Sequence, residues 1–164
     1  MSKIDSNVIC QIAIVVKDIE AAARNYSELF GMEMPEIFTV PPAEEVPVYY
    51  HGKLISPKAK ICIFQMGPIV LELTEPGEGP SSWREFLERH GQGVHHIGIE
   101  VQNLDNALNA LKKVGADVIQ VGYYPTSSYW FMDSEDQLGV RVNIKHGNED
   151  NSDKVKKHTS GNNA

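Results

Sequence analysis

Residues 11–31 read QIAIVVKDIEAAARNYSELFG, and residues 96–116 read HIGIEVQNLDNALNALKKVGA. Each stretch begins with alternating apolar residues, which predict a strand, and continues through Asp18 or Asn103, which favour a helix N-cap. An amphipathic stretch follows in both, with apolar residues three and four positions apart. This match predicts a duplicated strand–helix unit, and hence a fold built from two similar modules.

Three further strands are expected after each predicted helix. They lie near residues 36–40, 59–65 and 69–74 in the first copy, and near 117–122, 128–133 and 140–145 in the second. We therefore predict an α+β fold, in which two βαβββ modules form a cupped mixed sheet with the helices on its outer face. A short helix is expected in the linker over residues 83–90, capped by Ser81 or Ser82.

The predicted single domain covers residues 1–146, with its modules at about 8–76 and 93–146. Residues 147–164 are almost entirely polar, and we expect them to form a disordered tail. Residues 41–57 are rich in proline and have no counterpart in the second module. They either cover the cup as a lid or form an inert surface loop.

Composition and charge narrow the range of functions. The net charge of −7 argues against a nucleic-acid-binding surface, which needs clustered Lys and Arg. No apolar run approaches the ~20 residues that span a membrane, and the N-terminus lacks the apolar segment of a signal peptide. Cys10 and Cys62 lie in apolar runs and are expected to be free thiols. These features predict a cytoplasmic protein that binds neither membranes nor nucleic acid.

Four polar side chains fall at matching places in the two modules. Successive strand residues point to opposite faces, so in GVHHIGIEV (93–101) His95 shares the apolar face that packs on the helix and His96 points away. The same alternation directs Gln11, Glu72 and Asn143 away from the helices. In a cupped sheet these side chains could meet and surround a cation, although polar residues on one face of a sheet can also simply be solvated.

The chain resembles the vicinal oxygen chelate superfamily, which includes glyoxalase I, extradiol dioxygenases and bleomycin resistance proteins. Within it, the methylmalonyl-CoA epimerase branch is the most similar. The resemblance covers about residues 8–146, and it is carried by QIAIVVKDIEAAARNYSELFGM, IVLELTEP, FLERHGQGVHHIGIEVQNLDNAL and GVRVNI. It implies a homodimer that binds a small-molecule substrate and a divalent metal ion. The implied metal ligands are Gln11, Glu72, His96 and Asn143.

Two of these residues depart from the epimerase pattern, which has His where this chain has Gln11 and Glu where it has Asn143. An Asn side chain carries no transferable proton, so acid–base chemistry is lost at that position, and metal affinity is expected to fall. Glu72 is then the candidate base. Glu100 shares a strand face with His96 and is a second candidate, although it could equally be a solvated carboxylate.

The expected function is that of a metal-dependent lyase or isomerase, of the lactoylglutathione lyase or methylmalonyl-CoA epimerase type, that moves a proton α to a carbonyl. The alternative is a non-catalytic, resistance-type protein that binds a small molecule in the same cup. The aromatic run GYYPTSSYWF (122–131) could line that cup, or it could belong to the core or to a dimer surface.

Overall fold

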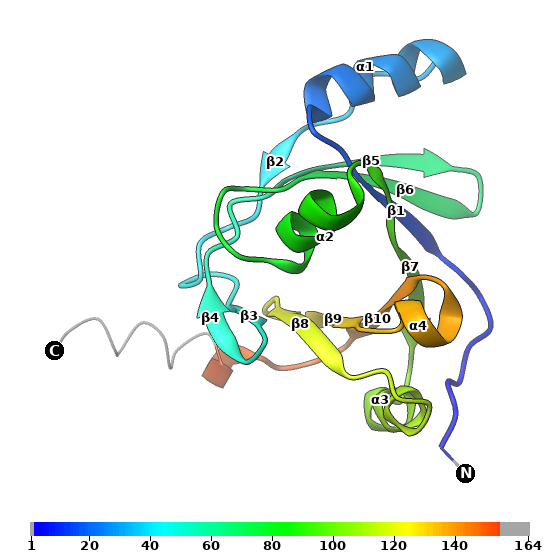
Figure 1. Ribbon diagram of the computed structural model, residues 1–164, viewed down its shortest axis with the longest axis vertical. Helices are drawn as coiled ribbons and strands as arrows, with labels where there is room; N and C mark the ends of the chain where they lie inside the picture. The colour runs from blue at the N-terminus through cyan, green and yellow to red at the C-terminus, as the bar shows by residue number, and fades with distance from the viewer. Residues whose placement is uncertain (1, 155–164) are drawn as a thin grey trace, which may run out of the picture.

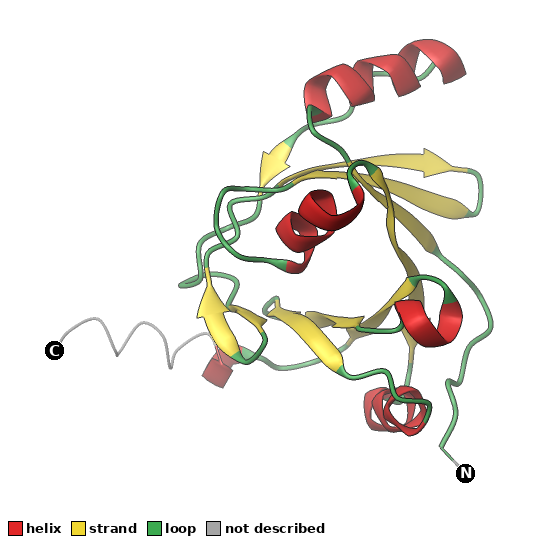
Figure 2. Ribbon diagram, in the orientation of Figure 1, coloured by secondary structure: helices red, strands yellow, loops and turns green. Residues whose placement is uncertain are grey.

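The computed structural model describes residues 2–154, which form one curled ten-stranded sheet and four helices (Figures 1 and 2). The strand order is β2-β5-β6-β1-β7-β10-β9-β8-β3-β4. The strands are β1 (Gln11–Val15), β2 (Phe38–Thr39), β3 (Val48–Tyr50), β4 (Lys53–Ile55), β5 (Lys60–Met66), β6 (Ile69–Glu75), β7 (Gly93–Val101), β8 (Val118–Tyr123), β9 (Ser127–Met132) and β10 (Arg141–Gly147). The helices are α1 (Ile19–Phe30), α2 (Ser82–His90), α3 (Leu104–Lys113) and α4 (Glu135–Leu138).

The two halves of the sheet repeat one topology. In the first half β1 pairs in parallel with β6, which pairs antiparallel with β5, and β5 with β2. In the second half β7 pairs in parallel with β10, which pairs antiparallel with β9, and β9 with β8. The halves join through the antiparallel pair of β1 and β7. The predicted pair of βαβββ modules in a cupped mixed sheet is confirmed.

Helices α1 and α3 cover the outer face of the curl, as predicted, whereas α2 lies inside it (Figure 1). The apolar face of β1, which includes Ile12 and Ile14, packs in one cluster with Ile19 and Ala23 of α1. The corresponding face of β7 packs in a second cluster with α3. Because these faces pack against the helices, the alternate residues of the same strands point into the hollow.

Local sequence signals set where the two outer helices begin. The Asp18 side chain accepts a hydrogen bond from the backbone N–H of Ala21, and Asn103 accepts one from the N–H of Asn106. Both are N-caps that satisfy a backbone donor otherwise left without a partner in the first turn. Helix α1 ends at Gly31, whose φ of 62° is in the left-handed region that favours glycine. No helix in residues 2–154 has the length and apolar character needed to cross a membrane.

Residues 41–57 are neither a lid nor an inert loop. Strands β3 and β4 form a hairpin in this segment, and β3 pairs antiparallel with β8. The first module therefore contributes two strands to the edge of the second module. Among the described residues, none from this segment lines the pocket described below.

The first residues of the predicted tail lie against the sheet. The side chain of Asn151 is buried and donates hydrogen bonds to the backbone carbonyls of Tyr124 (2.8 Å) and Ser127 (3.1 Å). The remainder of the predicted tail, residues 155–164, lies outside the described residues, and the domain limits stay a prediction.

Candidate active site

The floor of the hollow is formed by four neighbouring strands, in the order β6-β1-β7-β10. Each contributes one polar side chain to the concave face: Glu72, Gln11, His96 and Asn143, respectively. Gln11, His96 and Asn143 are buried, and Glu72 is half-buried. The structure thus brings together the four residues that sequence analysis selected.

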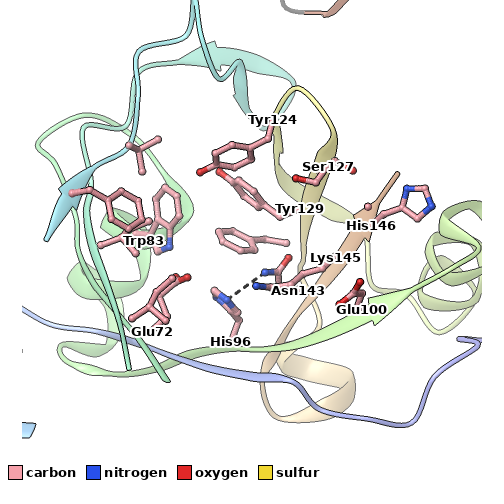
Figure 3. Close-up of a pocket in the computed structure, with 17 residues that line it drawn as sticks. Glu72, Trp83, His96, Glu100, Tyr124, Ser127, Tyr129, Asn143, Lys145 and His146 are labelled. Atoms are coloured by element: carbon pink, nitrogen blue, oxygen red, sulfur yellow. Dashed lines mark hydrogen bonds between the residues drawn. The ribbon is translucent and has the colours of Figure 1, made fainter. Parts of the chain in front are cut away.

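A pocket of about 330 Å³ opens above these residues (Figure 3). Part of its lining is aliphatic, and the rest carries aromatic rings and polar groups. The lining residues are Phe38, Val40, Ile61, Ile63, Glu72, Trp83, His96, Glu100, Tyr124, Ser127, Ser128, Tyr129, Phe131, Asn143, Lys145, His146 and Gly147. This combination of an apolar wall with a few converging polar groups is typical of small-molecule sites.

The floor residues form a continuous hydrogen-bond chain. Gln11 Nε2 lies 2.9 Å from Glu72 Oε2, and Gln11 Oε1 lies 3.0 Å from His96 Nε2. His96 Nδ1 lies 2.7 Å from His95 Nδ1, and His95 Nε2 lies 2.9 Å from Ser82 Oγ. At the far end, Arg141 Nη1 donates to Ser82 Oγ at 3.0 Å. The chain runs from a buried guanidinium to a carboxylate in the pocket.

The chain has a direction, because a carboxylate can only accept hydrogen bonds and a guanidinium can only donate them. Gln11 donates to Glu72, so its carbonyl oxygen accepts from His96 and the proton of that ring lies on Nε2. His96 Nδ1 then accepts from His95 Nδ1–H, and His95 Nε2 accepts from the Ser82 hydroxyl. With both imidazoles neutral, as their lowered pKa values require, they take opposite tautomers.

The prediction that His95 and His96 point to opposite faces of the sheet is wrong. The pairing of β1 with β7 shifts register, since Ala13 pairs with His96 while Ile14 pairs with Val94. His95 is the extra residue of this bulge, and a bulge redirects side chains. His95 is buried beneath α2, where its ring lies 5.4 Å from that of Phe86, instead of packing with the outer helix α3.

Burial controls the charge state of the floor. It lowers the pKa of His96 to about 3, helped by the positive charges of Lys145 and Arg141. Burial also lowers the pKa of His95 well below its usual value, with His96 and Arg141 adding to the effect. For Glu72, burial raises the carboxyl pKa, while Lys145 and the hydrogen bonds from Thr74 and Gln11 lower it in part. A carboxyl group raised in this way is suited to proton transfer near neutral pH.

The donor set does not fit a divalent metal ion. Within residues 2–154, no three His, Cys, Asp or Glu side chains are placed so that they could hold a metal ion together. Both amide atoms of Gln11 are engaged by Glu72 and His96, and the proton on His96 Nε2 occupies the lone pair that a metal would need. Neutral amide oxygens are also weak ligands for most transition metals. The predicted metal binding stays a prediction that this geometry does not support.

Glu100, the second predicted acid–base residue, lies on β7 and lines the pocket, but its side chain is exposed. Figure 3 places it at the opposite side of Asn143 from Glu72. The two predicted carboxylates therefore face one pocket from different ends.

Sequence analysis missed Lys145, which lines the pocket from β10. Its position two residues after Asn143 on the same strand is the signal that could have found it, because such residues share a face. Trp83 was predicted only as part of a linker helix, yet it also lines the pocket. The aromatic run 122–131 was expected to line the cup or to belong to the core or a dimer surface. Three of its rings line the pocket, whereas Tyr123 and Trp130 do not. The three are Tyr124, Tyr129 and Phe131.

The fold places this chain in the class of proteins built from two βαβββ modules. The two modules share one curled sheet and have a polar floor at their junction. Residues 10–133 match the Glyoxalase/Bleomycin resistance protein/Dioxygenase superfamily. The chain belongs to this superfamily, and the predicted resemblance is confirmed.

Relatives of the chain include named epimerases. It is 32% identical over 103 residues to the mitochondrial methylmalonyl-CoA epimerase of Homo sapiens, a match to 62% of this chain and 51% of the relative. It is 34% identical over 113 residues to the ethylmalonyl-CoA/methylmalonyl-CoA epimerase of Cereibacter sphaeroides, covering 68% of this chain and 73% of that one. The match thus spans about half the length of the human protein.

Solved structures show the same fold. A hypothetical protein of Bacillus halodurans superposes with a TM-score of 0.61 at 22% identity, covering 88% of this chain and 97% of that one. Streptomyces coelicolor methylmalonyl-CoA epimerase, in complex with 2-nitronate-propionyl-CoA, gives a TM-score of 0.57 at 22% identity, covering 85% and 94%. At such identity these structures support the fold alone. The homodimer and the cytoplasmic location stay predictions.

Proposed function

We propose that this chain is an acid–base enzyme of the epimerase or isomerase type, which moves a proton on the carbon next to a carbonyl group. The observation that carries the proposal is the position of Glu72, a half-buried carboxylate on the floor of the 330 Å³ pocket whose pKa is raised by burial. The match to relatives named as epimerases supports the same reaction class.

The structure offers a simple proton transfer. Both oxygens of Glu72 accept a hydrogen bond, Oε2 from Gln11 at 2.9 Å and Oε1 from Thr74 at 3.2 Å, and these bonds orient the carboxylate. Each oxygen keeps a lone pair that can take a proton from the substrate carbon. The electrons of the broken C–H bond then form a C=C bond, and the carbonyl oxygen gains negative charge. Return of the proton to carbon completes the exchange.

Inversion at the carbon needs a second group that returns the proton from the other side. Glu100 is the candidate, since it faces the pocket from the end opposite Glu72 (Figure 3). A single base would exchange the proton with retention of configuration, whereas two would allow epimerisation. Measurement of proton exchange therefore tests Glu72, and measurement of inversion tests Glu100.

The test is deuterium incorporation at the α carbon in D₂O, followed by NMR and mass spectrometry. The probes are methylmalonyl-CoA, ethylmalonyl-CoA and the hemithioacetal of methylglyoxal and glutathione. We expect exchange with at least one probe and a loss of about 10²–10⁴-fold in Glu72→Gln. Glu100→Gln is expected to retain exchange but to lose inversion.

The isosteric substitution Glu44→Gln, on an exposed residue that does not line the pocket, is the matched control and should change nothing. Absence of exchange with all three probes, both with a chelator and with added divalent metal ions, would overturn the proposal. In that case, saturable binding of a probe without exchange would favour the alternative of a non-catalytic binding protein.

A further inference from the structure

Lys145 extends from β10 into the pocket, with Asn143 beside it on the same face of the strand (Figure 3). The Asn143 carbonyl oxygen accepts a hydrogen bond from the Trp130 backbone N–H at 3.2 Å. Its amide nitrogen is therefore turned to the pocket side, where it comes within 3.4 Å of His96 Nε2. Since the shorter contact to Gln11 fixes a proton on that Nε2, the two N–H groups do not satisfy each other. Two donors of β10 thus face the cavity.

The Lys145 ammonium has no protein partner among residues 2–154, at hydrogen-bond or salt-bridge distance. Arg141, the other cation of β10, differs from Lys145 because it forms ion pairs with Glu85 and Glu135. A half-buried lysine usually acquires such a partner. An ammonium that lines a cavity without one is available to a ligand.

A glycine leaves room for the lysine. Gly98 of β7 pairs with Gln11 on one side and with Asn143 on the other. A Cβ atom at Gly98 would lie 2.9 Å from Gln11 Oε1 and 3.4 Å from Lys145 Cε. The end of the lysine side chain therefore lies over Gly98 of β7, where a side chain longer than a methyl group would compete with it for space.

The charge of Lys145 reaches the floor residues. Of the charged groups near Glu72, Lys145 is the one that lowers its pKa, and Lys145 also lowers the pKa of His96. The other titratable residues that face the pocket are Glu100, His146, Tyr124 and Tyr129. The ammonium is therefore the fixed positive charge at the centre of the site, and it would repel a divalent cation placed there.

We propose that Lys145 and Asn143 form an oxyanion-binding subsite, in which the lysine ammonium supplies the positive charge for which the superfamily resemblance implies a divalent metal ion. This inference rests on the proposed function for its reaction, since the oxyanion is the carbonyl oxygen that gains charge when Glu72 removes the α proton. Lys145 donates one N–H to that oxygen and Asn143 donates another, and the charge returns to carbon when the proton does.

The ligand class follows from these donors. It is a small molecule with an oxygen that is anionic or becomes anionic when the molecule enolises. Examples are a carboxylate, a thioester enolate and a nitronate. Two hydrogen-bond donors that converge on one oxygen suit a planar group in which that oxygen carries or gains negative charge. The apolar wall formed by Phe38, Val40, Ile61 and Ile63 would take a short alkyl substituent next to it.

The first experiment uses propane-2-nitronate, a small planar anion that resembles an enolate and needs no CoA group. Binding is followed by tryptophan fluorescence, to which Trp83 in the pocket contributes, and by the ¹⁵N resonances of His96, in a buffer with EDTA. We expect saturable binding that weakens about 100-fold in Lys145→Met, which keeps the length of the stem but removes the charge. Lys145→Arg should retain part of the affinity. Lys113→Met, on the exposed end of α3, is the matched control and should bind as the wild type does.

The second experiment titrates the protein with Mg²⁺, Mn²⁺, Co²⁺ and Zn²⁺ by calorimetry. We expect no stoichiometric binding tighter than about 100 μM at the pocket in the wild type. We also expect that EDTA leaves α-proton exchange within about twofold of its rate. Stoichiometric metal that restores exchange after EDTA treatment would overturn the subsite, and so would a Lys145→Met variant with unchanged nitronate affinity.

The two proposals can fail separately. Nitronate binding that depends on Lys145, without exchange on any acyl probe, supports the subsite and contradicts the proposed function. Exchange that depends on Glu72 but not on Lys145 supports the proposed function and contradicts the subsite. Absence of nitronate binding up to about 10 mM contradicts the subsite whatever the exchange assay shows.

Discussion

His95 and His96 are consecutive residues of one strand, yet their Nδ1 atoms lie 2.7 Å apart and their rings meet edge to face. A regular strand cannot bring neighbouring side chains together in this way, because they leave it on opposite faces. The bulge at His95 makes the contact possible. Through it, the buried pair of Arg141 and Ser82 is connected to His96 and supports the tautomer in which Nε2 carries the proton.

The first prediction concerns the tautomer of His96. In His95→Asn, the amide reaches the place of Nδ1 and can still donate to His96, but the contact with Ser82 is lost. In His95→Gln, the amide reaches the place of Nε2, so the Ser82 contact remains and the donor to His96 is lost. We expect ¹⁵N NMR to show the Nε2–H tautomer of His96 in all three proteins, since Gln11 still accepts from Nε2. The His96 Nδ1 resonance should move downfield only in His95→Gln, where that nitrogen has lost its hydrogen-bond donor.

Both variants leave one buried group unsatisfied, so each should lose about 1–3 kcal/mol of unfolding free energy. Their similar stability separates the effect on His96 Nδ1 from a general loss of structure. If both variants showed the same His96 spectrum, the direction that we assign to the hydrogen-bond chain would be wrong.

The sequence predicted much of this site because the relevant rules are local. Alternation along β1, β6 and β10 placed Gln11, Glu72 and Asn143 on the concave face, and the repeat placed the strands that carry them side by side. The predicted orientation of His95 was wrong because a bulge depends on how two strands far apart in the sequence pair. That register cannot be predicted from the residues of one strand. The hairpin of β3 and β4 was missed for the same reason, since it joins the other module.

The second prediction concerns stability in acid. The unfolded state binds a proton at His96 below pH ~6.5, whereas the folded state resists it down to a pKa of about 3. The free energy of unfolding should therefore fall as the pH falls through this window, by about 2 kcal/mol between pH 7.5 and pH 5 from His96 alone. His95 acts in the same direction. Glu72 acts in the opposite direction, because its raised pKa lets the folded state take up a proton first.

Urea unfolding at the two pH values, in the wild type and in His96→Gln, measures the contribution of His96. The variant should show a difference between the pH values that is smaller by about 2 kcal/mol. An equal pH dependence in both proteins would mean that His96 carries its proton in the folded state.

The third prediction compares two glycines of β7. In Gly98→Ala, the new Cβ atom would lie 2.8 Å from Gln11 Cβ, so the Gln11 side chain must move, and 3.4 Å from Lys145 Cε, which it would touch. We expect a loss of about 1–3 kcal/mol in urea unfolding and a weaker affinity for propane-2-nitronate. Gly93→Ala is the matched control in the same strand, because its nearest neighbour is a ring carbon of Phe86 at 3.9 Å, an ordinary contact. Equal behaviour of the two variants would contradict the role of Gly98 in making room for the lysine.

The fourth prediction is that the pocket can be converted to a metal site. Gln11→His with Asn143→Glu would give two imidazoles and two carboxylates on the four floor strands, a set that transition metals bind well. With Lys145 still present, the ammonium opposes the divalent ion, so the double variant should bind Co²⁺ weakly. Adding Lys145→Met removes this repulsion and should tighten Co²⁺ binding by about tenfold or more. The visible absorption of bound Co²⁺ measures both affinities, and equal affinities would show that the charge of Lys145 does not act at the place where a metal ion would be held.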